Sequence, residues 1–168
     1  MIQTKGLTKT YIKSGQPIQA VDNANLDISK NDFVVLYGPS GSGKSSLLLM
    51  LGGMLQPTSG TVLFNGEDIY AVSRTARNRF RRRHVGFIFQ KFFLMPYLTA
   101  YDNIRLQLTV QGCDEDVKER IAKVTEQLDI ASRMNHYPAE LSVGEQQRVA
   151  MARTLAGNPD LILADEPT

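Results

Sequence analysis

Short apolar runs along the chain predict the strands of the fold. Three of these runs are continuous, at residues 33–37, 85–89 and 161–164, which is typical of strands buried on both faces of a parallel sheet. Residues 17–28 alternate weakly between apolar and polar, so they predict a strand that is half exposed. The buried runs indicate a layered core with helices on its faces.

Helical patterns lie between the strand-like runs. Apolar spacing and helix-end signals predict helices over Ser45–Leu55, Ser73–Arg83, about 114–130 and about Ser142–Ala156. A further strand over Thr61–Phe64 ends in Asn65-Gly66, which favours a hairpin turn. The succession of strand, loop, helix and strand predicts an α/β fold with a mainly parallel sheet and an antiparallel β portion near the N-terminus.

The length of 168 residues suits one domain. No Pro/Gly/Ser-rich linker interrupts the chain, so we expect a single domain over 1–168 with two lobes. Residues 1–90 together with 157–168 are predicted to form its core, and residues 91–156 a helical lobe.

Composition excludes several classes of protein. Apolar residues make up 42% of the chain and the net charge is +2, which is typical of a folded protein without a global field for nucleic acid or membrane. The single cysteine, Cys113, indicates a reducing compartment. The N-terminus lacks the apolar centre of a signal peptide, and no apolar run is long enough to span a bilayer. We therefore expect a soluble protein whose membrane role, if any, comes through a partner.

A glycine-rich loop follows the first buried run and has the spacing of a phosphate-binding loop. Its glycines let successive backbone N–H groups point at phosphate oxygens, and the following helix adds its positive end. Lys44 is expected to reach the β- and γ-phosphates, and Ser45 to bind Mg²⁺. The loop consists of Gly38, Pro39, Ser40, Gly41, Ser42, Gly43, Lys44 and Ser45, and Ser46 follows directly as a further expected nucleotide-binding residue.

Two carboxylates end the last apolar run. Neighbouring side chains of a strand point to opposite faces, so Asp165 is expected to hold the Mg²⁺ water shell while Glu166 turns toward an attacking water. Near residue 142, Ser142 and Glu145 have the spacing of a capping box. A helix end of this kind is rich in N–H groups and binds anions.

The order of these motifs resembles that of the ABC ATPases. The segment Leu141–Arg148 is similar to their signature motif, usually Leu-Ser-Gly-Gly-Gln, with Val143 and Glu145 as departures. The phosphate loop, Gln90, the signature and the acidic strand follow one another as they do in that family. Residues 79–90 and 145–153 resemble the bacterial subgroup of lipoprotein-releasing and macrolide-exporter ATPases.

The resemblance implies an ATPase that powers a transporter, with ATP and Mg²⁺ as cofactors. Tyr11 would stack on adenine, Gln90 would sense Mg²⁺ and water, and Glu166 would be the general base. The signature residues Ser142, Gly144 and Glu145 would contact ATP bound by a second copy in a head-to-tail homodimer. Lys44 and Gln90 join Glu166 as the expected catalytic residues, and the expected Mg²⁺ ligands are Ser45, Gln90 and Asp165.

The resemblance also implies membrane partners. The apolar segment after Gln90, with Phe92, Phe93, Leu94, Met95, Tyr97 and Leu98, is either ordinary core or a groove for transmembrane permease subunits. The expected location is the inner face of a bacterial cell membrane, on the cytoplasmic side. The basic cluster Arg77, Arg79, Arg81, Arg82 and Arg83 is expected to be a solvated helix face, so nucleic acid is not expected as a partner.

Two rival functions stay open. One is a soluble ABC protein acting on ribosomes or DNA, although the chain has neither a tandem domain nor a long coiled-coil insertion. The other is a nucleotide-binding module without turnover. The family places further strands, an aspartate-containing loop and a histidine after the acidic strand, and the chain reaches Thr168 without them.

Overall fold

The computed structural model describes residues 1–113 and 115–166. The chain forms two compact units, Met1–Arg81 and Arg82–Thr168. The lobe boundaries expected from sequence stay a prediction. None of the helices among the described residues has the length and apolar character needed to cross a membrane.

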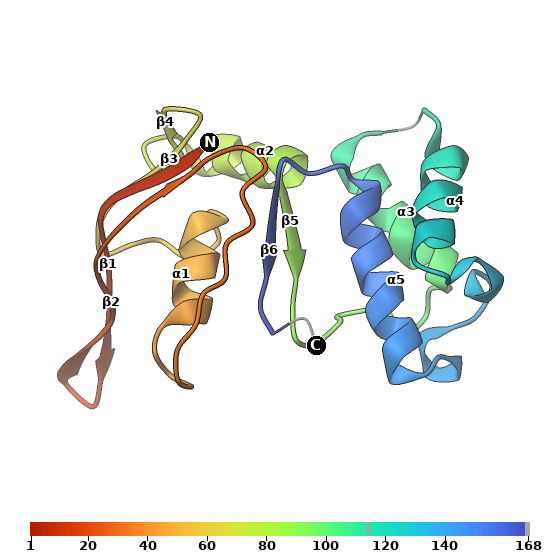
Figure 1. Cartoon of the computed structure of the whole chain (residues 1–168), viewed down its shortest axis with the longest axis horizontal. Coiled ribbons are helices and arrows are strands. Elements are labelled where there is room, and N and C mark those ends of the chain that lie inside the picture. Colours follow the sequence, from red (N-terminus) through yellow and green to blue (C-terminus); the bar gives the residue numbers. More distant parts are fainter. Residues whose placement is uncertain (114, 167–168) are drawn as a thin grey trace. The chain divides into compact units, whose positions relative to one another are not determined.

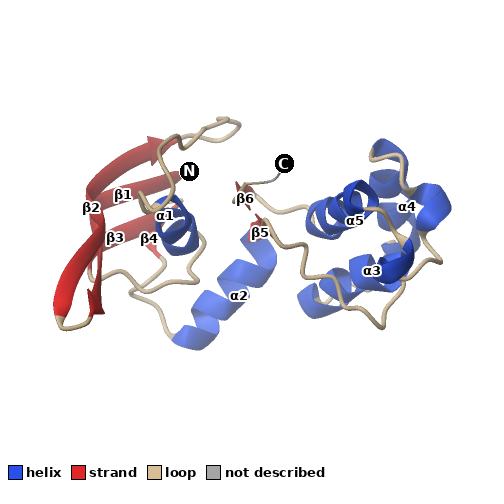
Figure 2. Ribbon diagram, turned by 90° about the horizontal axis from the view of Figure 1, so that it is seen from below, coloured by secondary structure: helices blue, strands red, loops and turns tan. Residues whose placement is uncertain are grey.

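The first unit is built on an antiparallel sheet with strand order β2-β1-β3-β4 (Figure 2). The turn between β3 and β4 has Asn65 and Gly66 at φ 51° and 89°, as a tight hairpin requires, so the turn prediction is confirmed. Strand β2 also confirms the predicted half-exposed strand. The strands are β1 Ile2–Lys13, β2 Gln16–Ile28, β3 Ser59–Phe64 and β4 Glu67–Asp68.

One face of this sheet is covered by the helix α1, Lys44–Leu51, as Figure 1 shows. Met50 and Leu51 of this helix are buried, and so are Ile2 and Val62 of the sheet. The Tyr70 hydroxyl donates to the carbonyl oxygens of Met50 and Leu55, at 2.7 and 2.6 Å, and its burial raises the pKa of this phenol. These bonds tie Tyr70 to the last turn of α1 and to the segment that follows it.

The prediction of a buried strand over 33–37 is wrong. This segment forms no strand, and the side chains of Phe33, Val34, Val35 and Tyr37 are exposed. An apolar run becomes a strand only if a neighbour supplies its ladder hydrogen bonds, and no strand among the described residues pairs with this one.

Helix α2, Arg74–His84, follows later and buries no residue. The predicted solvated basic face is confirmed only in part. Arg79, Arg82 and Arg83 are exposed, whereas Arg77 and Arg81 are half-buried, Arg77 over the Tyr70 ring and Arg81 donating to the Gly53 carbonyl oxygen.

The second unit contains a two-stranded parallel sheet and a group of helices. Strands β5, Val85–Ile88, and β6, Leu161–Ala164, pair in register from Val85↔Leu161 to Ile88↔Ala164, which confirms both predicted strands. The helices α3, α4 and α5 lie together around one apolar cluster (Figures 1 and 2). Their bounds are α3 Ala100–Gln111, α4 Val117–Gln127 and α5 Val143–Ala156, with 3₁₀ turns at Ala131–Arg133 and Pro138–Glu140.

The apolar cluster explains the helical spacing seen in the sequence. Ile104, Leu108, Ile121 and Val149 are buried at its centre. Helix α4 confirms most of the predicted helix over 114–130, whose first position, residue 114, lies outside the described residues. Helix α5 confirms the helix predicted over Ser142–Ala156.

Candidate functional site

The phosphate loop leads into α1 without a side chain closing the helix end. Gly43 stands at the N-cap position with φ 89°, and no side chain among the described residues caps the helix there. The Lys44 Nζ donates to the carbonyl oxygens of Gly38 and Pro39, at 2.9 Å each. The loop therefore folds around its own lysine, and the first N–H groups of α1 are left for an anion.

Gly43 also lies too close to β2 for any other residue. A Cβ at this position would stand 1.9 Å from the Ala20 carbonyl oxygen. The positive φ and this close approach both require glycine. The loop is thus fixed against the sheet at the point where the helix begins.

Tyr11 lies beside the start of α1. Its hydroxyl and the Ser46 Oγ are 3.2 Å apart, and the Lys9 ammonium lies 5.3 Å from its ring centroid. Tyr11 pairs with Ile18 across the hairpin, and both side chains are exposed. An exposed ring beside the phosphate loop is available to stack on a flat ligand.

The carboxyl ends of β5 and β6 bring two predicted catalytic residues together. The Gln90 Nε2 donates to the Glu166 Oε2 at 2.9 Å, across 76 residues of sequence. The Asp165 N–H donates to the Ile88 carbonyl oxygen at 2.9 Å, which continues the pairing by one residue. Glu166 has φ 48°, so the chain turns directly after the strand and presents this carboxylate at the sheet edge.

The expected Mg²⁺ ligands fit the chemistry of the ion. Ser45, Gln90 and Asp165 supply a hydroxyl, an amide and a carboxylate oxygen. Mg²⁺ prefers such oxygen ligands and keeps several waters, so a small number of protein ligands is sufficient.

The signature segment begins α5 with a complete capping box. The Glu145 N–H donates to the Ser142 Oγ at 3.3 Å, and the Ser142 N–H donates to the Glu145 Oε2 at 2.8 Å. The Ser142 hydroxyl also donates to that oxygen, at 2.8 Å, and Arg133 Nε donates to Glu145 Oε1 at 2.6 Å. The bond from Arg133, followed by those from Ser142, lowers the pKa of Glu145 to about 2.

Val143, one of the two departures from the family motif, is exposed. A Cβ placed on Gly144 would have no described atom within 4 Å apart from its chain neighbours and the backbone of its own helix. The signature end therefore presents an open surface next to a closed capping box. The capping box is readable from the sequence, whereas Arg133 is not, because nothing in the spacing of residues 133 and 145 marks an ion pair.

The backbone of the segment after Gln90 is anchored by side-chain hydrogen bonds, although many of its own side chains are exposed. Arg153 of α5 donates to the Phe92 and Phe93 carbonyl oxygens at 2.7 and 2.8 Å, and burial lowers the pKa of its guanidinium. The fully buried Asn103 donates to the carbonyl oxygens of Met95, Leu98 and Thr99 and accepts from the Met95 N–H. Neither anchor was found from the sequence.

These anchors leave Phe93, Met95 and Tyr97 exposed, while Leu94 packs against the helical cluster. One part of the segment therefore packs in the core, and another part forms an apolar surface.

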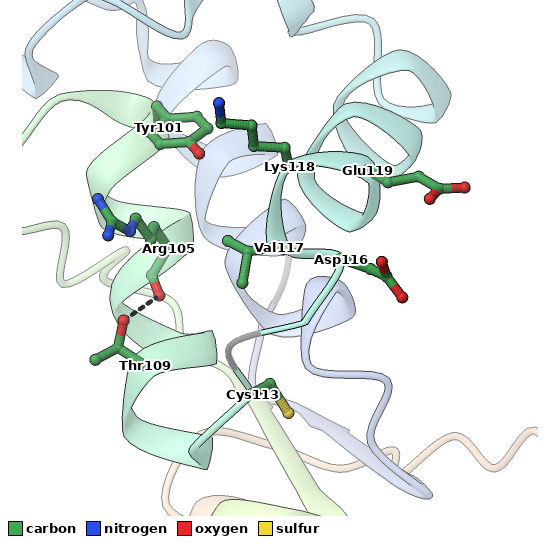
Figure 3. A pocket seen from close by; sticks show the side chains of 8 residues that line it. All are labelled: Tyr101, Arg105, Thr109, Cys113, Asp116, Val117, Lys118 and Glu119. Atoms are coloured by element: carbon green, nitrogen blue, oxygen red, sulfur yellow. Dashed lines mark hydrogen bonds between the residues drawn. The ribbon is translucent and has the colours of Figure 1, made fainter.

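An open cavity of about 550 Å³ lies apart from all these motifs, between α3 and the start of α4 (Figure 3). None of the predicted site residues lines it. Its lining consists of Tyr101, Arg105, Thr109, Cys113, Asp116, Val117, Lys118 and Glu119.

Comparisons with known proteins agree with these motifs. A family profile described as ABC transporter matches residues 21–168. An uncharacterized ABC transporter ATP-binding protein of Methanocaldococcus jannaschii is 44% identical over 169 residues, covering 100% of this chain and 75% of that protein. The lipoprotein-releasing system ATP-binding protein LolD of Shewanella oneidensis is 41% identical, with 100% and 74% covered.

Solved structures give the same picture. The chain is similar to a dimeric ATP-binding cassette in a post-hydrolysis state bound to ADP and Pi, with a TM-score of 0.93 and 39% identity. That match covers 100% of this chain and 75% of the other, so the chain spans about three quarters of the length of these relatives.

Proposed function

The chain belongs to the ABC transporter family of ATP-binding proteins, and on that premise we propose how its own residues divide the work of ATP hydrolysis. As a cassette of this family it binds ATP with Mg²⁺ and hydrolyses it, in a dimer that powers a transporter. The observation that carries the proposal is the hydrogen bond between Gln90 and Glu166 at the adjacent ends of β5 and β6.

The nucleotide is held by the first unit. The Lys44 ammonium exchanges its two loop carbonyls for the β- and γ-phosphate oxygens, and the free N–H groups at the start of α1 add to this binding. The Tyr11 ring stacks on the adenine. Ser45, Gln90 and Asp165 are the residues that would hold Mg²⁺, which would supply positive charge to the phosphates.

The water is positioned by the second unit. The Glu166 carboxylate accepts a proton from the attacking water, and the Gln90 amide fixes the orientation of that carboxylate by the bond it donates. The signature end of α5, with Ser142 and Gly144, meets the γ-phosphate bound by a second copy.

The test is the variant Glu166→Gln. It keeps the size of the side chain and the acceptor for Gln90 but removes the base, so we expect ATP binding to be retained and phosphate release to fall about a hundredfold or more. ATP binding is measured by fluorescence titration and phosphate release by a coupled assay. Unchanged release in this variant would show that the base lies elsewhere.

We also propose that the exposed side chains of residues 91–98 dock on a permease. ATP-binding subunits of this family pair with membrane permeases and dimerise, and this segment is apolar, exposed and fixed by Arg153 and Asn103. This pairing would hold the chain on the cytoplasmic face of the membrane. The sequence similarity to LolD makes a lipoprotein-releasing or related exporter the proposed assembly.

Docking is tested by Phe93→Asp and Tyr97→Asp, which change exposed side chains. Both variants should stay folded and bind ATP but fail to co-purify with membranes that contain the permease. Leu94→Asp is the control for core packing, because Leu94 packs on the helical cluster and this variant should lose folded protein instead. Membrane recovery of Phe93→Asp and Tyr97→Asp equal to that of the wild type would remove the docking proposal.

A further inference from the structure

The signature end of α5 carries an acidic residue at the place where an anion is expected to bind. Glu145 is the third residue of the helix, directly after Val143 and Gly144. A negative charge at a helix N-terminus stabilises the helix itself. The same charge repels a phosphate that approaches this end, so the sequence combines a good cap with an unfavourable ligand site.

The charge of Glu145 is not removed by protonation. Hydrogen bonds from Arg133 and Ser142 hold the pKa of this carboxyl at about 2, so it is ionised throughout the neutral range. Neutralisation must therefore come from a cation. The Arg133 guanidinium is that cation, with its Nε 2.6 Å from the Glu145 Oε1.

The carboxylate is also held in one orientation. Its Oε2 faces Ser142, accepting from both the N–H and the hydroxyl, while its Oε1 faces Arg133. The Glu145 side chain is 17% exposed and that of Arg133 is 45% exposed. The pair thus lies at the rim of the signature end, with the carboxylate more enclosed than its partner.

Arg133 projects from a short turn that is anchored in the core. Its N–H donates to the carbonyl oxygen of Ile130, at 2.9 Å, and Ile130 is fully buried. Its own carbonyl oxygen accepts from the His136 N–H at 2.9 Å. The backbone of Arg133 is therefore fixed, and the guanidinium reaches Glu145 from a preformed position.

We propose that Arg133 is a positioning residue for ATP-dependent pairing of two copies: it cancels the charge of Glu145 and holds its carboxylate beside Ser142, so that the signature end can accept the partner's nucleotide phosphate. This inference rests on the proposed function, because it requires the signature end to meet phosphate on a second copy. Arg133 acts through Glu145 and does not itself contact the phosphate.

A charge cycle tests the proposal. Arg133→Ala leaves the Glu145 charge uncompensated, so ATP-dependent association should weaken by about tenfold or more, and more strongly at low salt. Glu145→Gln in the same chain removes that charge and keeps a capping-box residue, so the double variant should regain most of the association. Arg133→Lys keeps the cation and should lie near the wild type.

Association is measured by sedimentation velocity with ATP and Mg²⁺, and binding of fluorescent ATP to the phosphate loop is measured in parallel. Arg133→Ala should bind nucleotide as the wild type does. Equal association of Arg133→Ala and the wild type overturns the inference. Loss in Arg133→Ala that Glu145→Gln does not rescue also overturns it, because Arg133 would then be only a brace of the fold. A wild-type chain that binds ATP but never associates overturns the proposed role of the signature end, and the inference with it.

Discussion

Helices α1 and α5 both begin at an end proposed to meet phosphate, but the two ends are built differently. The end of α1 starts from Gly43, and no side chain of the described residues caps it. The end of α5 starts from Ser142 and is closed by a capping box with Glu145. An uncapped end leaves its N–H groups for a ligand, whereas a capped end has already satisfied part of them.

The charged side chains at the two helix ends also differ in how far they are available to a ligand. Lys44 at α1 donates to neutral carbonyl oxygens, so its charge is available to a polyphosphate. At α5 the charge of Arg133 is matched by that of Glu145. The α1 end is therefore suited to bind a nucleotide alone, while the α5 end adds a weaker contact once the nucleotide is in place. This difference favours an order in which ATP binds first and pairing follows.

The largest effect is expected on ATP affinity, at the start of α1. Lys44→Ala removes the full charge that reaches the β- and γ-phosphates, so the affinity for ATP should fall by about a hundredfold. Titration with ATP and Mg²⁺ measures this loss. Lys30→Ala is the matched control, because Lys30 is an exposed lysine of the same unit and its removal should leave the affinity within about twofold of wild type. Equal affinity of Lys44→Ala and the control would remove the phosphate-loop assignment.

A pair of glycines sharpens the comparison between the ends. Gly43→Ala places a Cβ 1.9 Å from the Ala20 carbonyl oxygen at a positive φ, so it should destabilise the protein by about 1–3 kcal/mol. A Cβ from Gly144→Ala meets no described atom within 4 Å beyond its chain neighbours and its own helix backbone, so this variant should stay within about 0.5 kcal/mol of wild type. Urea unfolding of both variants measures the difference. Similar losses in the two would mean that the ends are equally crowded.

Local signals were readable in the sequence, and distant pairings were not. The turn at Asn65-Gly66 and the capping box of Ser142 and Glu145 each lie within four residues, so spacing alone predicted them. The apolar run 33–37 predicts a strand, yet a strand depends on a neighbouring strand that the run itself does not specify.

The site shows the same division. Gln90 and Glu166 are recognised through a family resemblance, because their direct contact spans 76 residues. The anchors Arg133 and Arg153 carry no local motif, since their partners lie 12 and about 60 residues away. A buried or paired arginine is recognised only when its partner is known.

The smallest effect is expected on stability at low pH, through Glu145 at the start of α5. Because the folded-state pKa of Glu145 lies below its ordinary value of 4.5, its bonds stabilise the protein fully above about pH 4.5, and this contribution is lost as the pH falls through about 2. The bond from Arg133 is the largest cause of the lowered pKa, so Arg133→Ala should bring the Glu145 pKa toward 4.5 and reduce the loss over this window. The measurement is the free energy of unfolding by urea at several pH values between about 5 and about 2. Glu145→Gln is the control, since it has no charge to lose and should show the shallowest decline. If the free energy of unfolding of Arg133→Ala fell with pH as steeply as that of the wild type, Ser142 alone would hold the carboxylate. The Glu145 charge would then be neutralised by something other than Arg133.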